Sequence, residues 1–104
     1  MKYKLTKNKN QIGNITLYQI QALKDFSDVK TGDLGGWIEK EHNLSQKRDA
    51  WVFGDAWVSG DARVFGNARV FGNAWVSGNA WVYGDASISG DASISGDANI
   101  YDII

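Results

Sequence analysis

Residues 54–84, GDAWVSGDARVFGNARVFGNAWVSGNAWVYG, repeat a single six-residue pattern. Each Gly is followed by Asp or Asn and then by Ala, and Val stands two residues after Ala. Extended in both directions, the pattern gives nine hexads, which run to Asp102 and begin at Asp49, Asp55, Asp61, Asn67, Asn73, Asn79, Asp85, Asp91 and Asp97. A short fixed repeat is typical of a solenoid, in which each unit buries its apolar face by stacking on a neighbour.

The spacing within a hexad predicts a short strand and a corner. Ala and Val or Ile are two residues apart, so both point to the same side of an extended segment. Gly followed by Asp or Asn is turn chemistry, because these residues tolerate the backbone angles of a tight corner. We therefore expect Ala and Val or Ile to point inward.

The residue after each Val or Ile indicates how many hexads close one coil. Sorted by threes, these residues form the columns Ser59, Ser77, Ser95; Phe65, Tyr83, Tyr101; and Phe53, Phe71, Ser89. Positions three hexads apart thus behave as stacked cross-strand neighbours. The nine hexads are predicted to form three triangular coils, a stack about 14 Å tall at a strand spacing of about 4.8 Å.

The same sorting makes every corner column read Asp–Asn–Asp, as in Asp49, Asn67 and Asp85. Stacked Asp residues would repel one another, and an Asn between them can donate hydrogen bonds to both carboxylates. A calcium site is the weaker alternative, because calcium takes about six to eight oxygen ligands in one place. We expect a structural column and no metal site.

Residues 1–48 are predicted to form a cap for the solenoid of residues 49–104. Residues 2–6 and 15–23 read as two strands joined by a polar turn. Ile38 and Leu44 are six residues apart but two residues out of register with Val52, so residues 35–46 are expected to form a degenerate coil. A cap is needed because an open β-helix leaves unpaired strand edges.

The hexads, with an aliphatic residue and a small residue two positions before it, resemble the hexapeptide-repeat family over residues 49–102. A closer resemblance is to small hexapeptide-repeat proteins of phages and prophages. It rests on the near-perfect GNA and GDA hexads and on the preceding segment TGDLGGWIEKEHNLSQ, residues 31–46. The resemblance implies an all-β fold, a left-handed parallel β-helix of about three triangular coils with an N-terminal β-rich cap.

Many members of that family are trimeric acyltransferases that use acetyl-CoA or acyl-carrier protein with a His general base, and others are zinc carbonic anhydrases. This chain has one His, His42, and no loop interrupts its hexads; it also has no Cys, which excludes disulfides and thiolate nucleophiles. We therefore expect a protein without catalytic residues or a cofactor. A reduced acyltransferase that uses His42 is the alternative.

The outward position before each Val or Ile is rich in Trp and Arg, the residue types that dominate binding hot spots. We predict that a host or defence protein is bound through Trp57, Arg63, Arg69, Trp75 and Trp81, and inhibition of that protein is the effect we expect. One competing interpretation is stabilising aromatic ladders, with one face covered by the N-terminal half. Base stacking on nucleic acid is weaker, because the corners are acidic. A self-assembling structural module is a further alternative.

The end of the chain predicts self-association. No second cap follows the ninth hexad, and the chain closes on Ile103 and Ile104. A homodimer interface is expected at Ile100, Tyr101, Ile103 and Ile104, with a trimer as the second choice. The chain lacks a signal peptide and a long apolar run. This predicts no membrane association and a location in the cytoplasm of a bacterial host cell.

Overall fold

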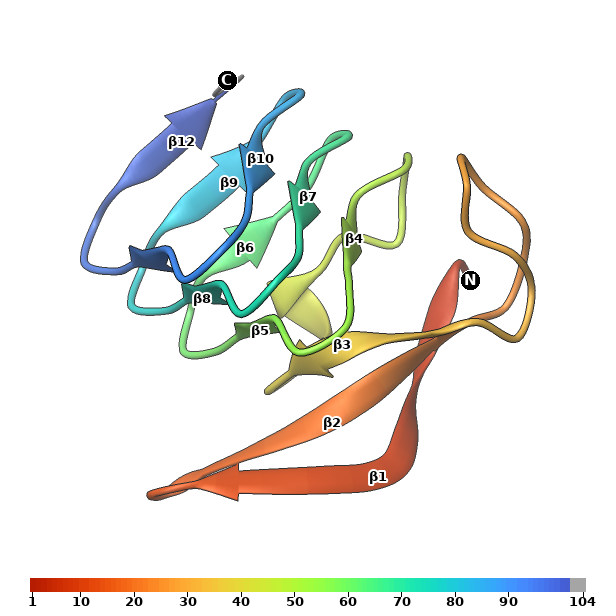
Figure 1. The fold of residues 1–104 in the computed structure, drawn as a ribbon, viewed down its shortest axis with the longest axis horizontal. Coiled ribbons are helices and arrows are strands. Elements are labelled where there is room, and N and C mark those ends of the chain that lie inside the picture. The colour runs from red at the N-terminus through yellow and green to blue at the C-terminus, as the bar shows by residue number, and fades with distance from the viewer. Residues whose placement is uncertain (102–104) are drawn as a thin grey trace.

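The computed structural model describes residues 1–101, which form an all-β solenoid with one 3-10 turn, η1 (Glu41–Asn43) (Figure 1). Strands β1 (Tyr3–Ile12) and β2 (Ile15–Ala22) form a hairpin that leads to β3 (Leu34–Ile38). One short strand follows from each hexad: β4 (Trp51–Val52), β5 (Trp57–Val58), β6 (Arg63–Val64), β7 (Arg69–Val70), β8 (Trp75–Val76), β9 (Trp81–Tyr83), β10 (Ser87–Ile88), β11 (Ser93–Ile94) and β12 (Asn99–Tyr101).

Three sheets make the three sides of the solenoid. Strands β3, β5, β8 and β11 form the hairpin face, whose sheet is extended by β2 and β1. Strands β4, β7 and β10 form the loop face, and β6, β9 and β12 form the ladder face. Along each face the strands are parallel, and residues eighteen apart pair, as Trp57 does with Trp75 and Val64 with Val82. The predicted three hexads per coil are confirmed.

The inward side chains form one continuous core. The exposed fraction is zero for Ala and Val throughout the first two regular coils: Ala50, Val52, Ala56, Val58, Ala62, Val64, Ala68, Val70, Ala74, Val76, Ala80 and Val82. Full burial stabilises the fold by about 1.5–3 kcal/mol for each Val side chain. In the last coil Ile94 and Ile100 are only partly buried, because no further coil within residues 1–101 stacks on them.

The segment before the hexads adds a fourth, degenerate coil. Strand β3 pairs in parallel with β5, with Ile38 opposite Val58, and Leu44 forms a bridge to Val64. These partners are twenty residues apart instead of eighteen. The predicted shift of two residues is confirmed, and Arg48, which lies within the longer connection, has a positive φ of 58°.

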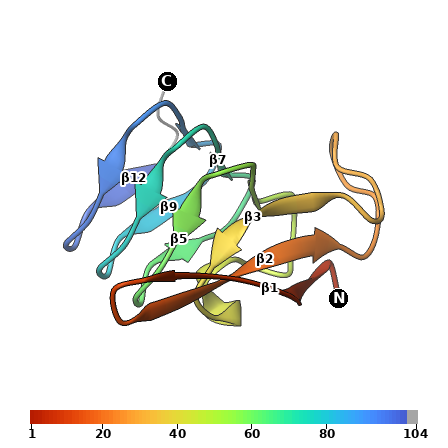
Figure 2. The same cartoon turned by 60° about the horizontal axis from the view of Figure 1, so that its bottom comes forward.

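The hairpin and the first residues of the chain close the lower end of the solenoid (Figure 2). Tyr3 and Ile20 are fully buried in the same core as Ile38. The Tyr3 hydroxyl donates to the backbone carbonyls of Glu41 and Leu44. The first strand extends to Ile12, well beyond the predicted residue 6, because residues 9–12 pair with β2 again after an irregularity between Leu5 and Lys9.

Lys2 is fully buried beside this cap. Its ammonium group donates to the carbonyl of Ala50 at 2.6 Å and to that of Arg48 at 3.3 Å. It also lies 5.0 Å from the centroid of the Phe26 ring. Burial lowers the pKa of Lys2 to about 8, because loss of water disfavours the charged form.

At the corners, the amide side chains bond in one direction only. The Nδ2 atoms of Asn67, Asn73 and Asn79 donate to the Oδ1 atoms of Asp85, Asp91 and Asp97 in the last coil, over 3.3–3.4 Å. The prediction that each Asn donates to both neighbouring carboxylates is wrong, because these short side chains all lean toward the last coil. The columns themselves are stacked as predicted.

Candidate binding surfaces

The structure distributes the five predicted partner-binding residues over three faces. Trp57 and Trp75 stack on the hairpin face, Arg63 pairs with Trp81 on the ladder face, and Arg69 lies on the loop face. They therefore do not form one surface, and each face must be considered by itself.

The loop face is covered beside its first strand by the connection between β2 and β3 (Figure 1). Trp51 is only 2 % exposed, and it packs against the Phe26 ring in an edge-to-face arrangement at a centroid distance of 5.2 Å. Arg69 Nη2 donates to Asp28 Oδ1 at 2.6 Å, and its guanidinium lies 4.8 Å from the centroid of Phe53. The hydrogen bond from Arg69 lowers the pKa of Asp28. The alternative interpretation, that the N-terminal half covers one face, is confirmed here.

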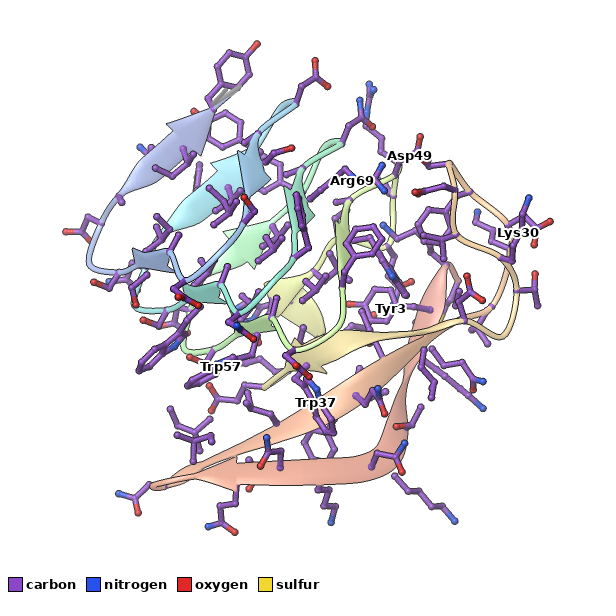
Figure 3. All side chains as sticks on the ribbon, viewed as in Figure 1. Tyr3, Lys30, Trp37, Asp49, Trp57 and Arg69 are labelled. Carbon is purple, nitrogen blue, oxygen red and sulfur yellow. The ribbon has the colours of Figure 1, made fainter. Side chains whose placement is uncertain are left out.

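The hairpin face carries a column of three Trp side chains, from Trp37 through Trp57 to Trp75. The Trp57 and Trp75 rings are stacked, with centroids 4.3 Å apart and planes 16° apart. The labelled Trp37 and Trp57 side chains point away from the core (Figure 3). Trp57 is half-buried, whereas Trp75 is 39 % exposed. Because the Trp57 and Trp75 rings cover each other, less aromatic surface is exposed to solvent here than two separate Trp rings would expose.

The ladder face carries a column of rings that we call the aromatic ladder: Phe65, Tyr83 and Tyr101. The Phe65 and Tyr83 rings are stacked at 5.0 Å with planes 4° apart, and Tyr101 lies 5.1 Å from Tyr83 with a tilt of 40°. Trp81 stands nearly perpendicular to both Phe65 and Tyr83 and is 45 % exposed. Arg63, in register with Trp81, is exposed as well. The ladder face therefore offers the largest group of exposed aromatic side chains.

An open groove of about 520 Å³ runs along the base of the ladder face. It is lined by Glu41, His42, Leu44, Ser45, Gln46, Arg63, Val64 and Phe65. A smaller hollow of about 220 Å³ shares Ser45 and Phe65 with this groove and is also lined by Lys47, Arg48 and Gly66. Sequence reasoning did not find these hollows. The available signal was the departure of residues 44–52 from the hexad spacing, which places a non-repeating segment beside the first regular coil.

His42 lines the larger groove from η1. Its Nε2 atom is 3.9 Å from Asp61 Oδ1, a carboxylate oxygen that also contacts the Lys40 ammonium at 3.3 Å. A general base needs a free position within hydrogen-bond reach of a substrate proton, and the groove provides space beside the ring. Within residues 1–101, no three His, Cys, Asp or Glu side chains lie together as a metal site would require.

The predicted oligomer interface is only partly described. Ile100 is half-buried and Tyr101 is 63 % exposed at the end of the aromatic ladder, whereas Ile103 and Ile104 lie outside the described residues. Strands β10, β11 and β12 are each the last strand of their sheet within the described part of the chain. None of the helical segments between residues 1 and 101 has the length and apolar character of a membrane span.

Comparison with known proteins agrees with this fold. Residues 62–78 match the model of the YdcK beta solenoid repeat family. The chain is also similar to the uncharacterized acetyltransferase YdcK of Escherichia coli (strain K12), with 45 % identity over 40 residues. The matched segment is 38 % of this chain but only 12 % of that relative. The similarity thus supports the hexapeptide-type β-solenoid class.

Proposed function

We propose that this protein is a binding module that recognises another protein through its ladder face. The observation that carries the proposal is the aromatic ladder together with Trp81, which is 45 % exposed, and the exposed Arg63 beside it. Trp, Tyr and Arg are the residue types most enriched in binding hot spots. The two hollows that Phe65 lines give this face depressions into which side chains of a partner can fit.

The other two faces support the role less well. On the loop face, Trp51 is buried and the Arg69 guanidinium is already bound to Asp28. On the hairpin face, the half-buried Trp57 ring covers one face of the exposed Trp75 ring, and β2 and β1 extend the sheet. The ladder face keeps its three strands without an added hairpin strand. Arg63 and Trp81 therefore stay in the proposed site, Trp57 and Trp75 form a secondary surface, and Arg69 holds the covering loop.

The partner we expect is a protein of a bacterial host, in line with the resemblance of the hexads to phage proteins. A pull-down from a bacterial lysate tests this expectation with three baits: the unchanged chain, the double variant Arg63→Ala/Trp81→Ala and the matched variant Trp75→Ala. We expect a stoichiometric protein on the unchanged chain and on Trp75→Ala, and its loss from the double variant. Equal capture by all three baits, or capture by none, would contradict the proposal.

Acyl transfer is a second candidate, because His42 lines the larger groove with Asp61 close to its ring. The name of the Escherichia coli relative points to the same chemistry. In this scheme His42 would take the proton of an acceptor hydroxyl or amine in the groove. Calorimetric titration with acetyl-CoA distinguishes the two candidates. Binding that disappears in His42→Ala would favour the acyltransferase, whereas the binding-module proposal predicts no acetyl-CoA binding.

A further inference from the structure

We propose that the partner segment held by the ladder face is an acidic peptide whose carboxylates bind at the groove around Arg63. The inference rests on the proposed function and specifies the chemistry of the partner. It also assigns a direction to the bound peptide. The carboxylates of the peptide lie at the lower end of the ladder face, and its apolar side chains lie toward the last coil. Three features of the face support it, namely ring orientation, local charge and the position of the acidic corners.

The first feature is the orientation of the rings. Phe65 and Tyr83 are stacked face to face at 5.0 Å with planes 4° apart, so each covers a face of the other. Where the two rings cover each other, a partner can approach only their edges, which carry the positive part of the aromatic quadrupole. Carboxylate and carbonyl oxygens are favourable neighbours for such edges. A nucleic-acid base needs an open ring face instead, so the same geometry disfavours base stacking between these two rings.

The second feature is the local charge. Three exposed cationic side chains surround Phe65: Arg63 in the larger groove, and Lys47 and Arg48 in the smaller hollow. Within residues 1–101 none of the three forms an ion pair, whereas Arg69, Lys40 and His42 each contact a carboxylate. The Glu41 carboxylate in the groove accepts a hydrogen bond from Gln46 Nε2 at 3.3 Å. The three cationic side chains outnumber this one carboxylate in the lining of the two hollows, so the region is a cationic patch on a chain whose net charge is −1.

The third feature is the acidic corner higher on the same edge. The corners at the lower end are acidic as well, but Asp61 is paired there with Lys40 at 3.3 Å and Asp49 lies near the Lys2 ammonium. Asp85, which follows Tyr83 by two residues, is exposed and accepts a hydrogen bond from Asn67, and within residues 1–101 it forms no ion pair. A carboxylate of the partner would be repelled there and attracted at Arg63, where a guanidinium can hold it with two parallel hydrogen bonds. Trp81 and Tyr101, exposed by 45 % and 63 %, lie toward the last coil and favour apolar side chains. The bound segment should therefore place its carboxylates beside Arg63 and its apolar side chains beside Trp81 and Tyr101.

Nuclear magnetic resonance titration tests the inference. The probe is an acetylated, amidated peptide with three Glu followed by Leu and Phe; the matched peptide has Lys in place of Glu, and a short oligothymidylate stands for nucleic acid. The five Trp indole N–H signals report separately on each face, since Trp81 alone belongs to the ladder face. We expect the acidic peptide to shift the Trp81 indole and the Arg63 and Phe65 amides, with the affinity reduced at high salt.

The variants sharpen this test. Arg63→Ala is expected to weaken binding of the acidic peptide about tenfold, because one charge-assisted carboxylate contact is lost. Lys4→Ala, which removes an exposed cation from β1, is expected to leave the affinity unchanged. The inference is overturned if the Lys peptide or the oligothymidylate binds the face as tightly, or if the acidic peptide shifts only signals of the hairpin or none.

Competition between the acidic peptide and the captured lysate protein distinguishes failure of this inference from failure of the proposed function. If a lysate protein depends on Arg63 and Trp81 but an excess of the acidic peptide does not displace it, the ladder face is a binding site for another class of partner. If no lysate protein depends on these residues, the proposed function itself fails. Displacement of the captured protein by the Glu peptide and not by the Lys peptide supports both.

Discussion

Arg69 and Asp28 form an ion pair, with Nη2 and Oδ1 2.6 Å apart, that fastens the connection between β2 and β3 to the second regular coil. Beneath this connection Trp51 packs against Phe26 and Tyr3. One contact between residues forty-one positions apart thus links the non-repeating part of the chain to the repeats. It also explains why an Arg of the repeat is not free to act as a binding residue.

Removal of this partly exposed ion pair is expected to loosen the covering segment around Asp28, while Phe26 and Val29 stay packed against the core. In Arg69→Ala, backbone amides of residues 24–33 should exchange hydrogen faster. The matched variant is Arg63→Ala, which removes the same side chain from the next face, where it has no ion pair within residues 1–101. Hydrogen-exchange mass spectrometry checks this, and equal exchange in both variants would argue against the assigned role of Arg69.

The buried Lys2 predicts an unusual dependence of stability on pH. Its pKa is about 8 in the folded protein and near 10.5 when unfolded, so between these values the unfolded chain binds more protons. The free energy of unfolding should therefore rise with pH, by about 2 kcal/mol between pH 7 and pH 10. Urea unfolding at successive pH values measures it.

Tyr3 sets the upper limit of that rise. Burial, with the Glu41 carboxylate as the lesser cause, raises the pKa of the Tyr3 hydroxyl, so above about pH 10 the unfolded chain loses this proton first and stability falls again. The control is Lys2→Met, in which the rise from pH 7 to pH 10 should vanish while the fall above pH 10 remains. A rise that persists in Lys2→Met would refute the role given to Lys2.

The corner glycines predict a position-dependent cost of adding a methyl group. At Gly78 the φ angle is +67°, and a Cβ would lie 2.7 Å from the backbone nitrogen of Gly96. At Gly54 the φ angle is +56° but nothing lies within 4 Å. Gly54→Ala should cost about 1–2 kcal/mol for the left-handed conformation alone, and Gly78→Ala should cost more because stacked backbones must separate. Urea unfolding of the two variants measures both losses of unfolding free energy. Equal losses would contradict the prediction, because they would mean that the stacked backbones separate without cost.

The end of the solenoid predicts self-association through Ile100, Tyr101 and the two terminal Ile residues. Ile100 and Ile94 are only partly buried in the last coil, and the edges of β11 and β12 have no further strand within residues 1–101. We expect the full chain to be a homodimer by light scattering after size exclusion, and a chain that ends at Tyr101 to be a monomer. The same mass for both chains would exclude the terminal Ile residues from an interface.

The repeating part of the fold was predictable because each hexad creates the environment of the next. The inward Ala and Val residues, the pairing of Trp57 with Trp75 and the column of Phe65, Tyr83 and Tyr101 all follow from the spacing. The shift of Ile38 and Leu44 was predictable for the same reason, since it is a departure from a known period.

The rest of the structure depends on contacts that the six-residue repeat does not predict. Burial of Lys2 requires the carbonyls of Arg48 and Ala50, and a lysine near the start of a chain otherwise reads as a surface residue. Docking of Phe26 on Trp51 joins a non-repeating loop to the first hexad. The groove beside Arg63 exists because residues 44–52 depart from the hexad spacing. The outward residues could therefore be predicted from the sequence, but the face that has the groove could not.

The central claim is that the ladder face binds a partner protein, and site-specific photo-crosslinking tests it most directly. Trp81 is replaced by benzoylphenylalanine, with Trp75 on the hairpin face and Ser87 on the loop face as matched positions. After irradiation in a bacterial lysate, one covalent product is expected from position 81, weaker or absent from positions 75 and 87, and suppressed by Arg63→Ala. No product from position 81, or the same product from all three positions, would contradict the claim.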